Sequence, residues 1–174
     1  MPLRRTLKHM NRIRSAISSA IPLAMACCLL QALPVCAQPK TVGSTVESRT
    51  ITVRIDRPFD KVYEFLVDPA HWNQWAFGLG KNLRKSSNGW VADSGGGTVR
   101  VRFTPRNNFG VVDHTVTRPK GDRVYIPMRL IVNGGGCELL FTLFREPNMS
   151  DAQFASDTNF VQRDLDGLKA LMEK

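Results

Sequence analysis

The first 37 residues of the chain contain no aspartate or glutamate, although the chain as a whole has 15 acidic residues. Five basic residues fall within residues 1–14, and a largely apolar run follows over residues 16–35. A basic start, an apolar stretch and a small residue at the end are typical of a secretory signal peptide. The sequence therefore predicts a signal peptide over residues 1–37, cleavage after Ala37, and a periplasmic or secreted protein.

Two alternatives to cleavage after Ala37 stay open. The apolar run is about long enough to remain as a membrane anchor, although Pro22 and Pro34 interrupt it. A lipoprotein is the second alternative, with Cys36 or Cys27 as the lipidated residue. Lipid attachment favours a small residue before the cysteine, so Val35 suits Cys36 badly, whereas an alanine precedes Cys27.

Cysteine is scarce beyond this segment. Three of the four cysteines lie before residue 38, which leaves only Cys137. A single cysteine excludes an internal disulfide. The alternating residues around Cys137 favour a half-buried structural thiol near the end of a strand.

The excess of positive charge is also concentrated at the N-terminus. The net charge of +9 would fall to +4 after cleavage, because the removed segment carries five basic and no acidic residues. So mild a charge, without a basic cluster, gives no indication of a nucleic-acid partner.

Familiar catalytic and metal-binding motifs are missing. His71 and His114 stand 43 residues apart without supporting ligands, and neither G-x-S-x-G nor H-E-x-x-H occurs. The glycine triplets at 95–97 and 134–136 are not followed by Lys-Ser/Thr, so we interpret them as hairpin turns. We expect no metal and no cofactor.

Residues 38–48 are polar and without periodicity, which predicts a flexible linker before a domain over residues 49–174. Alternation predicts a first strand at 49–55. Pro58 suits the first turn of a helix that ends at Asp68-Pro69, and a second short helix is predicted at 70–75.

Alternating segments follow, and they predict strands at 89–93, 98–104, 111–117, 123–132 and 138–144. Ser150 and Gln153 form a capping box at the start of a long C-terminal helix. Apolar residues recur along this helix every three or four positions through Met172. The element order predicts an α+β fold, in which a curved antiparallel sheet wraps on the C-terminal helix.

The order of elements and their motifs resemble one superfamily. Residues 51–75 combine a strand, Arg-Pro, an aromatic-bearing helix, Asp-Pro and Trp-x-x-Trp, and the segments FGVVDH (109–114), PMR (127–129), FTLF (141–144) and PNMSD (147–151) follow. They resemble the helix-grip or START-like (SRPBCC) superfamily, which contains polyketide cyclases, plant pathogenesis-related proteins and lipid-transfer domains. The resemblance implies a helix-grip fold with a cavity for an apolar or amphipathic small molecule.

Patterning alone does not separate such a pocket from a packed core, because the same inward-facing residues suit both. With the resemblance, the expected pocket residues are Trp72, Trp75, Val101, Phe103, Val112, His114, Ile126, Met128, Leu130, Phe154 and Val161. The two tryptophans suit a pocket entrance and core packing equally.

His114 alternates with two valines, so its side chain is expected on the apolar face. It is the one candidate for acid–base catalysis. The favoured interpretation is a satisfied core histidine that also contacts a ligand. Asp113 points the other way on a regular strand, so the pair is not a catalytic dyad.

Arginines alternate with the apolar set, at positions 100, 102, 123 and 129. We expect them on the outer face of the sheet as a solvated surface, with Asp93, Asp113 and Glu138 nearby. An anionic surface or lipid headgroup bound there is the less favoured alternative.

The leading hypothesis is an exported binding protein for a small hydrophobic or amphipathic ligand, lipid or polyketide-like, held between sheet and helix. One alternative is a cyclase- or dehydratase-like enzyme that uses His114. The other is an interaction module with a filled core. A membrane is expected as a partner only during export or as the source of the ligand. The sequence gives no prediction of the oligomeric state.

Overall fold

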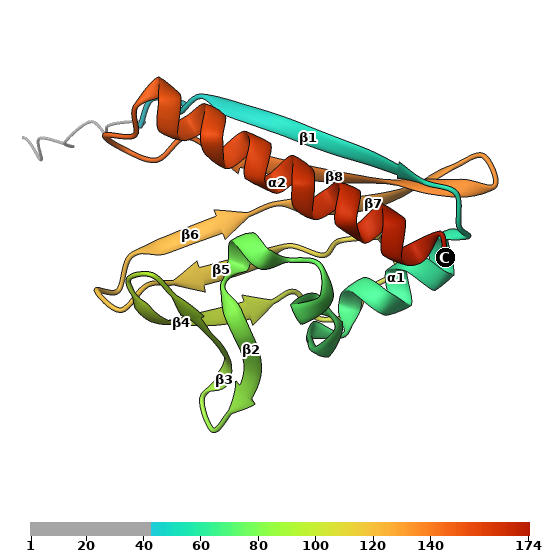
Figure 1. Ribbon diagram of the computed structural model, residues 1–174, viewed down its shortest axis with the longest axis horizontal. Coiled ribbons are helices and arrows are strands. Elements are labelled where there is room, and N and C mark those ends of the chain that lie inside the picture. The colour runs from blue at the N-terminus through green and yellow to red at the C-terminus, as the bar shows by residue number, and fades with distance from the viewer. Residues whose placement is uncertain (1–42) are drawn as a thin grey trace, which may run out of the picture. The chain divides into compact units, whose positions relative to one another are not determined.

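The computed structural model describes residues 43–174, so the predicted signal peptide and the first part of the linker lie outside the described residues. Most strands follow one another directly and the long helix comes last, as is typical of α+β architecture (Figure 1). In chain order they are β1 (Ser48–Ile55), α1 (Phe59–Val67), the 3₁₀ helices η1 (Pro69–Gln74) and η2 (Phe77–Leu79), β2 (Lys81–Ser86), β3 (Gly89–Ser94), β4 (Gly97–Phe103), β5 (His114–Thr117), β6 (Arg123–Ile126), β7 (Met128–Asn133), β8 (Gly136–Phe144) and α2 (Asp151–Met172).

The strands form two antiparallel sheets, in the orders β1-β8-β7 and β2-β3-β4-β5-β6. The two sheets share one extended segment, because only Pro127 separates β6 from β7. Proline has no N–H to offer a ladder, but the Pro127 carbonyl still accepts a hydrogen bond from Thr142 N at 2.9 Å. The predicted single strand at 123–132 is therefore divided at Pro127.

Residues 110–113 hold this junction together. The carbonyl of Gly110 accepts from Leu130 N at 2.8 Å, and Val111 forms a bridge with Arg129. The Asp113 carboxylate accepts from Met128 N at 2.7 Å and from the Tyr125 hydroxyl. The Asp113 side chain thus links residues on both sides of Pro127. Residues 110–113, which precede β5, stabilise the junction between the two sheets.

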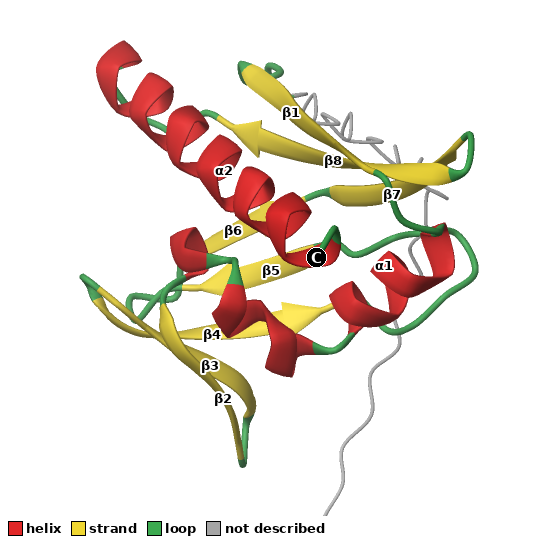
Figure 2. Cartoon of the chain, turned by 45° about the vertical axis from the view of Figure 1, so that its right-hand side comes forward, coloured by secondary structure: helices red, strands yellow, loops and turns green. Residues whose placement is uncertain are grey.

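All helices lie on one face of the sheets, which we call the inner face (Figure 2). Strict alternation places the apolar residues of the strands on that face, and β4 is an example with Val99 and Val101 buried between exposed neighbours. The same alternation continues through Pro127, since Ile126, Met128 and Leu130 are all buried. The core therefore lies between the sheets and the helices.

Local signals account for the helix ends. The capping box predicted for α2 is confirmed, because the Ser150 hydroxyl accepts from Gln153 N at 3.2 Å and the Gln153 side chain accepts from Ser150 N at 3.0 Å. Pro58 immediately precedes α1, and the Asp68 side chain that follows this helix caps η1 by accepting from Ala70 N at 2.9 Å.

The first strand and the last helix of the described chain are held together by hydrogen bonds. β1 pairs with β8 along its whole length, from Ser48 opposite Phe144 to Ile55 opposite Cys137. Directly after β1, Asp56 N donates to Glu173 Oε1 at 2.7 Å, and Arg57 Nε donates to the carbonyl of Met172 at 2.7 Å. The C-terminal end of α2 is fixed to the chain that leaves the first strand.

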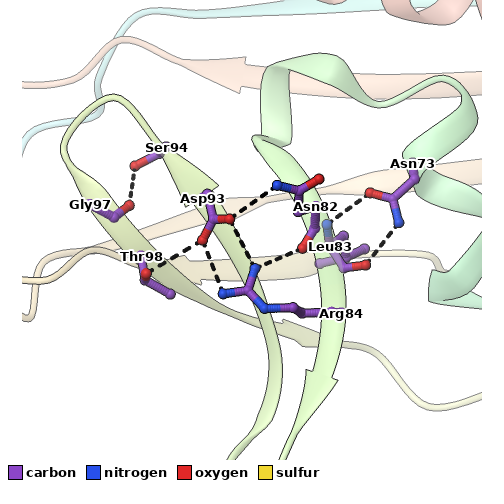
Figure 3. A network of polar contacts seen from close by, with 8 residues as sticks. All are labelled: Asn73, Asn82, Leu83, Arg84, Asp93, Ser94, Gly97 and Thr98. Atoms are coloured by element: carbon purple, nitrogen blue, oxygen red, sulfur yellow. Dashed lines mark hydrogen bonds and ion pairs between the residues drawn. The ribbon is translucent and has the colours of Figure 1, made fainter.

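β2 is absent from the sequence prediction because it has no apolar alternation, and Leu83 is its only buried residue. Side chains from elsewhere hold it in place (Figure 3). The Asn73 amide both donates to the carbonyl of Leu83 and accepts from Leu83 N, each at 2.8 Å, as a neighbouring strand would. Arg84 then pairs with Asp93 of β3 at 3.0 Å.

Other differences follow from local geometry. The strand predicted at 111–117 begins only at His114, because Gly110 has a left-handed φ of 67° and residues 104–113 form a loop. Cys137 lies near the start of β8, as predicted, but it is fully buried rather than half-buried, because β8 is the central strand of its sheet. Among residues 43–174, no helix has the length and apolar character needed to span a membrane.

Candidate functional site

Trp72 is the centre of an aromatic cluster at one end of the inner face. Its ring centroid lies 4.9 Å from that of Trp75, 4.8 Å from Phe103 and 4.9 Å from His114. Its indole N–H donates to the carbonyl of Leu66 at 2.8 Å, so its polar atom is satisfied at the end of α1. Both tryptophans are only 2 % exposed and so belong to the core rather than to an open entrance.

His114 lies on the inner face as predicted, and 5 % of its surface is exposed. Burial lowers the pKa of the imidazole to about 4, although the negative charge of Asp113 acts in the opposite direction. The ring is therefore neutral at neutral pH. Asp113 points to the other face, as the sequence predicted, although it lies in the loop before β5 and not on a regular strand. Its carboxylate accepts from the Tyr125 hydroxyl and from Met128 N.

Two buried nitrogens near Trp72 have no hydrogen-bond partner within the described part of the chain. They are Nε1 of Trp75 and Nδ1 of His114. Buried polar atoms are normally paired with protein or water, and each exception calls for an explanation. Both rings contact Trp72, so an otherwise apolar interior contains an indole donor and a neutral imidazole nitrogen that are available to an oxygen-bearing molecule or a water.

The opposite end of the inner face is less completely covered. Apolar side chains there are only partly buried although they pack against the core, namely Val116 and Val124 of β5 and β6, Phe141 and Leu143 of β8, and Val161 of α2. They alternate with outward-facing residues, so they face the helix side of the sheets. The interior thus has an aromatic end, where Trp72, Trp75 and His114 are buried, and a partly exposed aliphatic end.

η2 closes one side of the interior against α2. Gly78 N donates to the Asp164 carboxylate at 2.7 Å, and a methyl group at Gly78 would lie 3.3 Å from the Phe160 ring. Burial raises the pKa of Asp164, while the backbone N–H groups of Gly78 and Phe77 act in the opposite direction. The contact joins a short loop to the middle of the helix.

Two surface hollows lie outside this interior. One, of about 260 Å³, is formed by the loop before α2 and the first turns of that helix, with Glu146, Met149 and Asp157 in its wall. The other, of about 480 Å³, includes the outward-facing Arg102, Thr115 and Tyr125 and also touches Phe103 and His114. Neither is a hollow between the sheets and α2.

The structure buries almost all of the expected pocket residues. Phe103 and Val161 are partly buried, and the following nine are fully buried: Trp72, Trp75, Val101, Val112, His114, Ile126, Met128, Leu130 and Phe154. Trp72, Phe103 and His114 come together with Trp75, whereas Phe154 lies apart at the start of α2 beneath the guanidinium of Arg49, 4.7 Å from its ring centre. These residues line the interior between the sheets and the helices.

The sequence prediction of the pocket omitted Phe141 and Leu143. β8 is apolar at nearly every position, so its pattern does not indicate which face each residue takes. Its register supplies the missing information, because Phe141 lies opposite the buried Met128 and Ile51.

The site offers no metal-binding cluster. Within residues 43–174, no three His, Cys, Asp or Glu side chains come together as a metal ion would require. The unpaired polar atoms near Trp72 are a neutral imidazole nitrogen and an indole N–H.

No protein-family model matches the chain, and no curated protein matches it by sequence. Solved structures do share its fold. DynU16, a protein of the dynemicin biosynthetic locus, matches 73 % of this chain with a TM-score of 0.55 and 16 % identity, and this chain spans 47 % of DynU16. Ara h 8.0201 matches 73 % of this chain and 97 % of its own, with a TM-score of 0.53 and 14 % identity.

The Aha1 dimer from Colwellia psychrerythraea gives a similar result, with a TM-score of 0.55, 18 % identity and coverage of 73 % of this chain and 96 % of its own. These likenesses agree with the arrangement of the elements themselves. The chain has the α+β helix-grip fold, as the sequence resemblance implied. Functions differ widely within one fold, so the fold alone does not assign a function.

Proposed function

We propose that this protein binds a small hydrophobic or amphipathic molecule between its sheets and α2. The observation that carries the proposal is the partly exposed aliphatic end of the inner face, where Val116, Val124 and Leu143 face the side of Val161 without being fully covered. Covering such side chains with an apolar ligand is favourable by about 25 cal/mol for each Å² removed from water.

The aromatic end of the interior favours one kind of ligand among small hydrophobic or amphipathic molecules. Trp75 Nε1 and His114 Nδ1 are unpaired and uncharged, so they suit a ligand that carries a neutral oxygen, such as a hydroxyl or a carbonyl. A buried carboxylate would need a cation or several donors, and the aromatic cluster provides neither. The best candidate is a largely apolar molecule with few polar atoms.

Binding fits the site better than the proposed alternative of acid–base catalysis. A general base works best with a pKa near the operating pH and usually has a second group that orients it. His114 has a pKa of about 4, and its Nδ1 has no partner among the described residues. We therefore propose a carrier or receptor role, and His114 as a ligand contact.

Val161→Trp is expected to weaken binding of the neutral fluorescent probe N-phenyl-1-naphthylamine at least tenfold, because the larger ring would fill the partly exposed aliphatic end. Asn159→Trp is the matched control, since Asn159 is exposed on the same helix. Fluorescence titration of the lipid-extracted proteins measures both. Equal probe affinity for the two variants, with unchanged circular dichroism, would contradict the proposed location.

We also propose that the protein acts after export, with a mature chain that begins at Gln38. The support is the basic and apolar character of residues 1–37. Intact mass spectrometry of protein recovered from the medium or the periplasm of its host is expected to give the mass of residues 38–174. An intact Met1 would refute cleavage, and an added diacylglyceryl mass on Cys27 or Cys36 would identify a lipoprotein.

A further inference from the structure

The outer face of the sheets carries four arginines that no acidic side chain neutralises. Arg100, Arg102, Arg123 and Arg129, here called the arginine face, alternate with buried residues and are all exposed. None of them forms an ion pair with any residue of the described range 43–174. Cross-strand pairing places Arg100 and Arg123 on opposite sides of Thr117, so these two arginines are neighbours on the face.

The acids expected to balance this face are engaged elsewhere. Asp93 pairs with Arg84 at 3.0 Å and also accepts from Asn82 (Figure 3). Glu138 lies 3.9 Å from Arg54 and accepts from Asn133 at 3.2 Å. Asp113 is the one that remains within the face.

The Asp113 carboxylate is a wall of the hollow of about 480 Å³ that also contains Arg102. Its two oxygens already accept from the Tyr125 hydroxyl and Met128 N. One carboxylate against four arginines leaves the face strongly positive.

Exposed apolar side chains lie at one end of the arginine face. Phe109 is 77 % exposed and Ile131 is 42 % exposed. The hydrogen bond from Leu130 N to the carbonyl of Gly110 brings Phe109 to the same end as Ile131. From Arg123 to Ile131 the strand segment extends roughly 25 Å at about 3.3 Å per residue.

Arginines beside protruding apolar side chains match the chemistry of an anionic bilayer, which offers phosphate groups at its surface and acyl chains just beneath. A nucleic acid or an acidic protein would use the arginines, but it would leave Phe109 and Ile131 without a role.

We propose that the arginine face, together with Phe109 and Ile131, docks the protein on the surface of an anionic phospholipid membrane. The guanidinium groups contact the lipid phosphates, and the apolar side chains enter the acyl boundary. The helices and the proposed ligand site face away from that contact. The inference does not depend on the ligand, because it uses only outward-facing residues.

Sedimentation with vesicles tests this surface. The vesicles are phosphatidylcholine alone, or phosphatidylcholine with about one third phosphatidylglycerol, and the readout is the ratio of the two affinities. Each variant is prepared as the exported, lipid-extracted protein with its N-terminus read by mass spectrometry, so that all variants carry the same N-terminal segment. Thermal melts confirm that each variant is folded.

The wild-type protein is expected to prefer the anionic vesicles, and Arg102→Gln with Arg129→Gln should weaken that binding roughly 25-fold, about fivefold for each arginine. The control Lys61→Gln with Arg163→Gln removes the same charge from exposed sites on α1 and α2 and should change little. Phe109→Ser should weaken binding to the anionic vesicles several-fold, whereas Phe77→Ser, at a site 59 % exposed elsewhere, should not.

Equal losses in the arginine variant and its charge-matched control would overturn the proposal, as would a wild-type protein without preference for the anionic vesicles. Release of the bound protein by inorganic phosphate at constant ionic strength would identify a site for small anions instead of a docking surface. Because the probe ligand is absent from these measurements, failure here leaves the proposed ligand site intact, and the converse also holds.

Discussion

Gly110→Ala is expected to cost about 4 kcal/mol of folding free energy or to prevent recovery of folded protein. Gly110 has a φ of 67°, and a methyl group on its Cα would overlap the carbonyl oxygen of Leu130. The overlapped atom belongs to the backbone of β7, so a side-chain rotation cannot relieve it. The Leu130 N to Gly110 carbonyl bond of 2.8 Å would have to lengthen or break. Denaturant unfolding monitored by tryptophan fluorescence measures the loss.

Gly134→Ala is the matched control. Gly134 has a similar φ of 59°, but a methyl group there would meet no atom within 4 Å. It should therefore show only the cost of a left-handed alanine, about 1–2 kcal/mol. If the two variants lose equal stability, the close approach to Leu130 contributes nothing and the explanation given for Gly110 is wrong.

Acidification from about pH 6.5 to pH 4 is expected to cost the fold about 3 kcal/mol through His114 alone. The pKa of His114 is lowered from 6.5 to about 4 by burial. Between these values the unfolded chain holds a proton on this imidazole and the folded chain does not. The unfolded state therefore binds more protons, and the free energy of unfolding falls as the pH falls through this window.

His114→Phe isolates this contribution, because it keeps a ring beside Trp72 and Phe103 but removes the titrating nitrogens. We expect its free energy of unfolding to change less between pH 7 and pH 4.5 than that of the wild type, by about 2–3 kcal/mol. Carboxylates titrate in both proteins and cancel in the comparison. An equal pH dependence in both proteins would show that His114 is not buried in its neutral form.

Much of the fold could be predicted because the local patterns and the tertiary contacts agree. Alternation identified β1 and β4, and the Ser150 capping box located the start of α2. β2 could not be found, because it is held by the Asn73 side chain rather than by an apolar stripe. The division at Pro127 depends on a second sheet that a local window does not see.

The candidate site was less predictable. Inward-facing positions such as His114 and Met128 follow from alternation, so the residue types of the interior were available from sequence. The degree of burial was not, because it depends on how closely α2 approaches each strand. Trp72 and Trp75 therefore suited an entrance and a core equally, and only their ring contacts placed them in the core.

The partners of the acidic side chains also could not be predicted from the sequence. The sequence predicted three acids beside the outer arginines, namely Asp93, Asp113 and Glu138. In the structure, Asp93 forms an ion pair with Arg84, and Glu138 forms one with Arg54. Asp113 remains at the face but is held by Tyr125 and Met128.

The pairing of β1 with β8 has a consequence for the order in which the chain folds. Ile55 pairs with Cys137, and Ser48 pairs with Phe144. The three-stranded sheet therefore cannot form until most of the domain has been synthesised. The hydrogen bonds from Asp56 and Arg57 to the C-terminal end of α2 form later still. Such long-range closure is slow compared with the formation of a hairpin. The closing of the three-stranded sheet is therefore among the last steps in the folding of this chain.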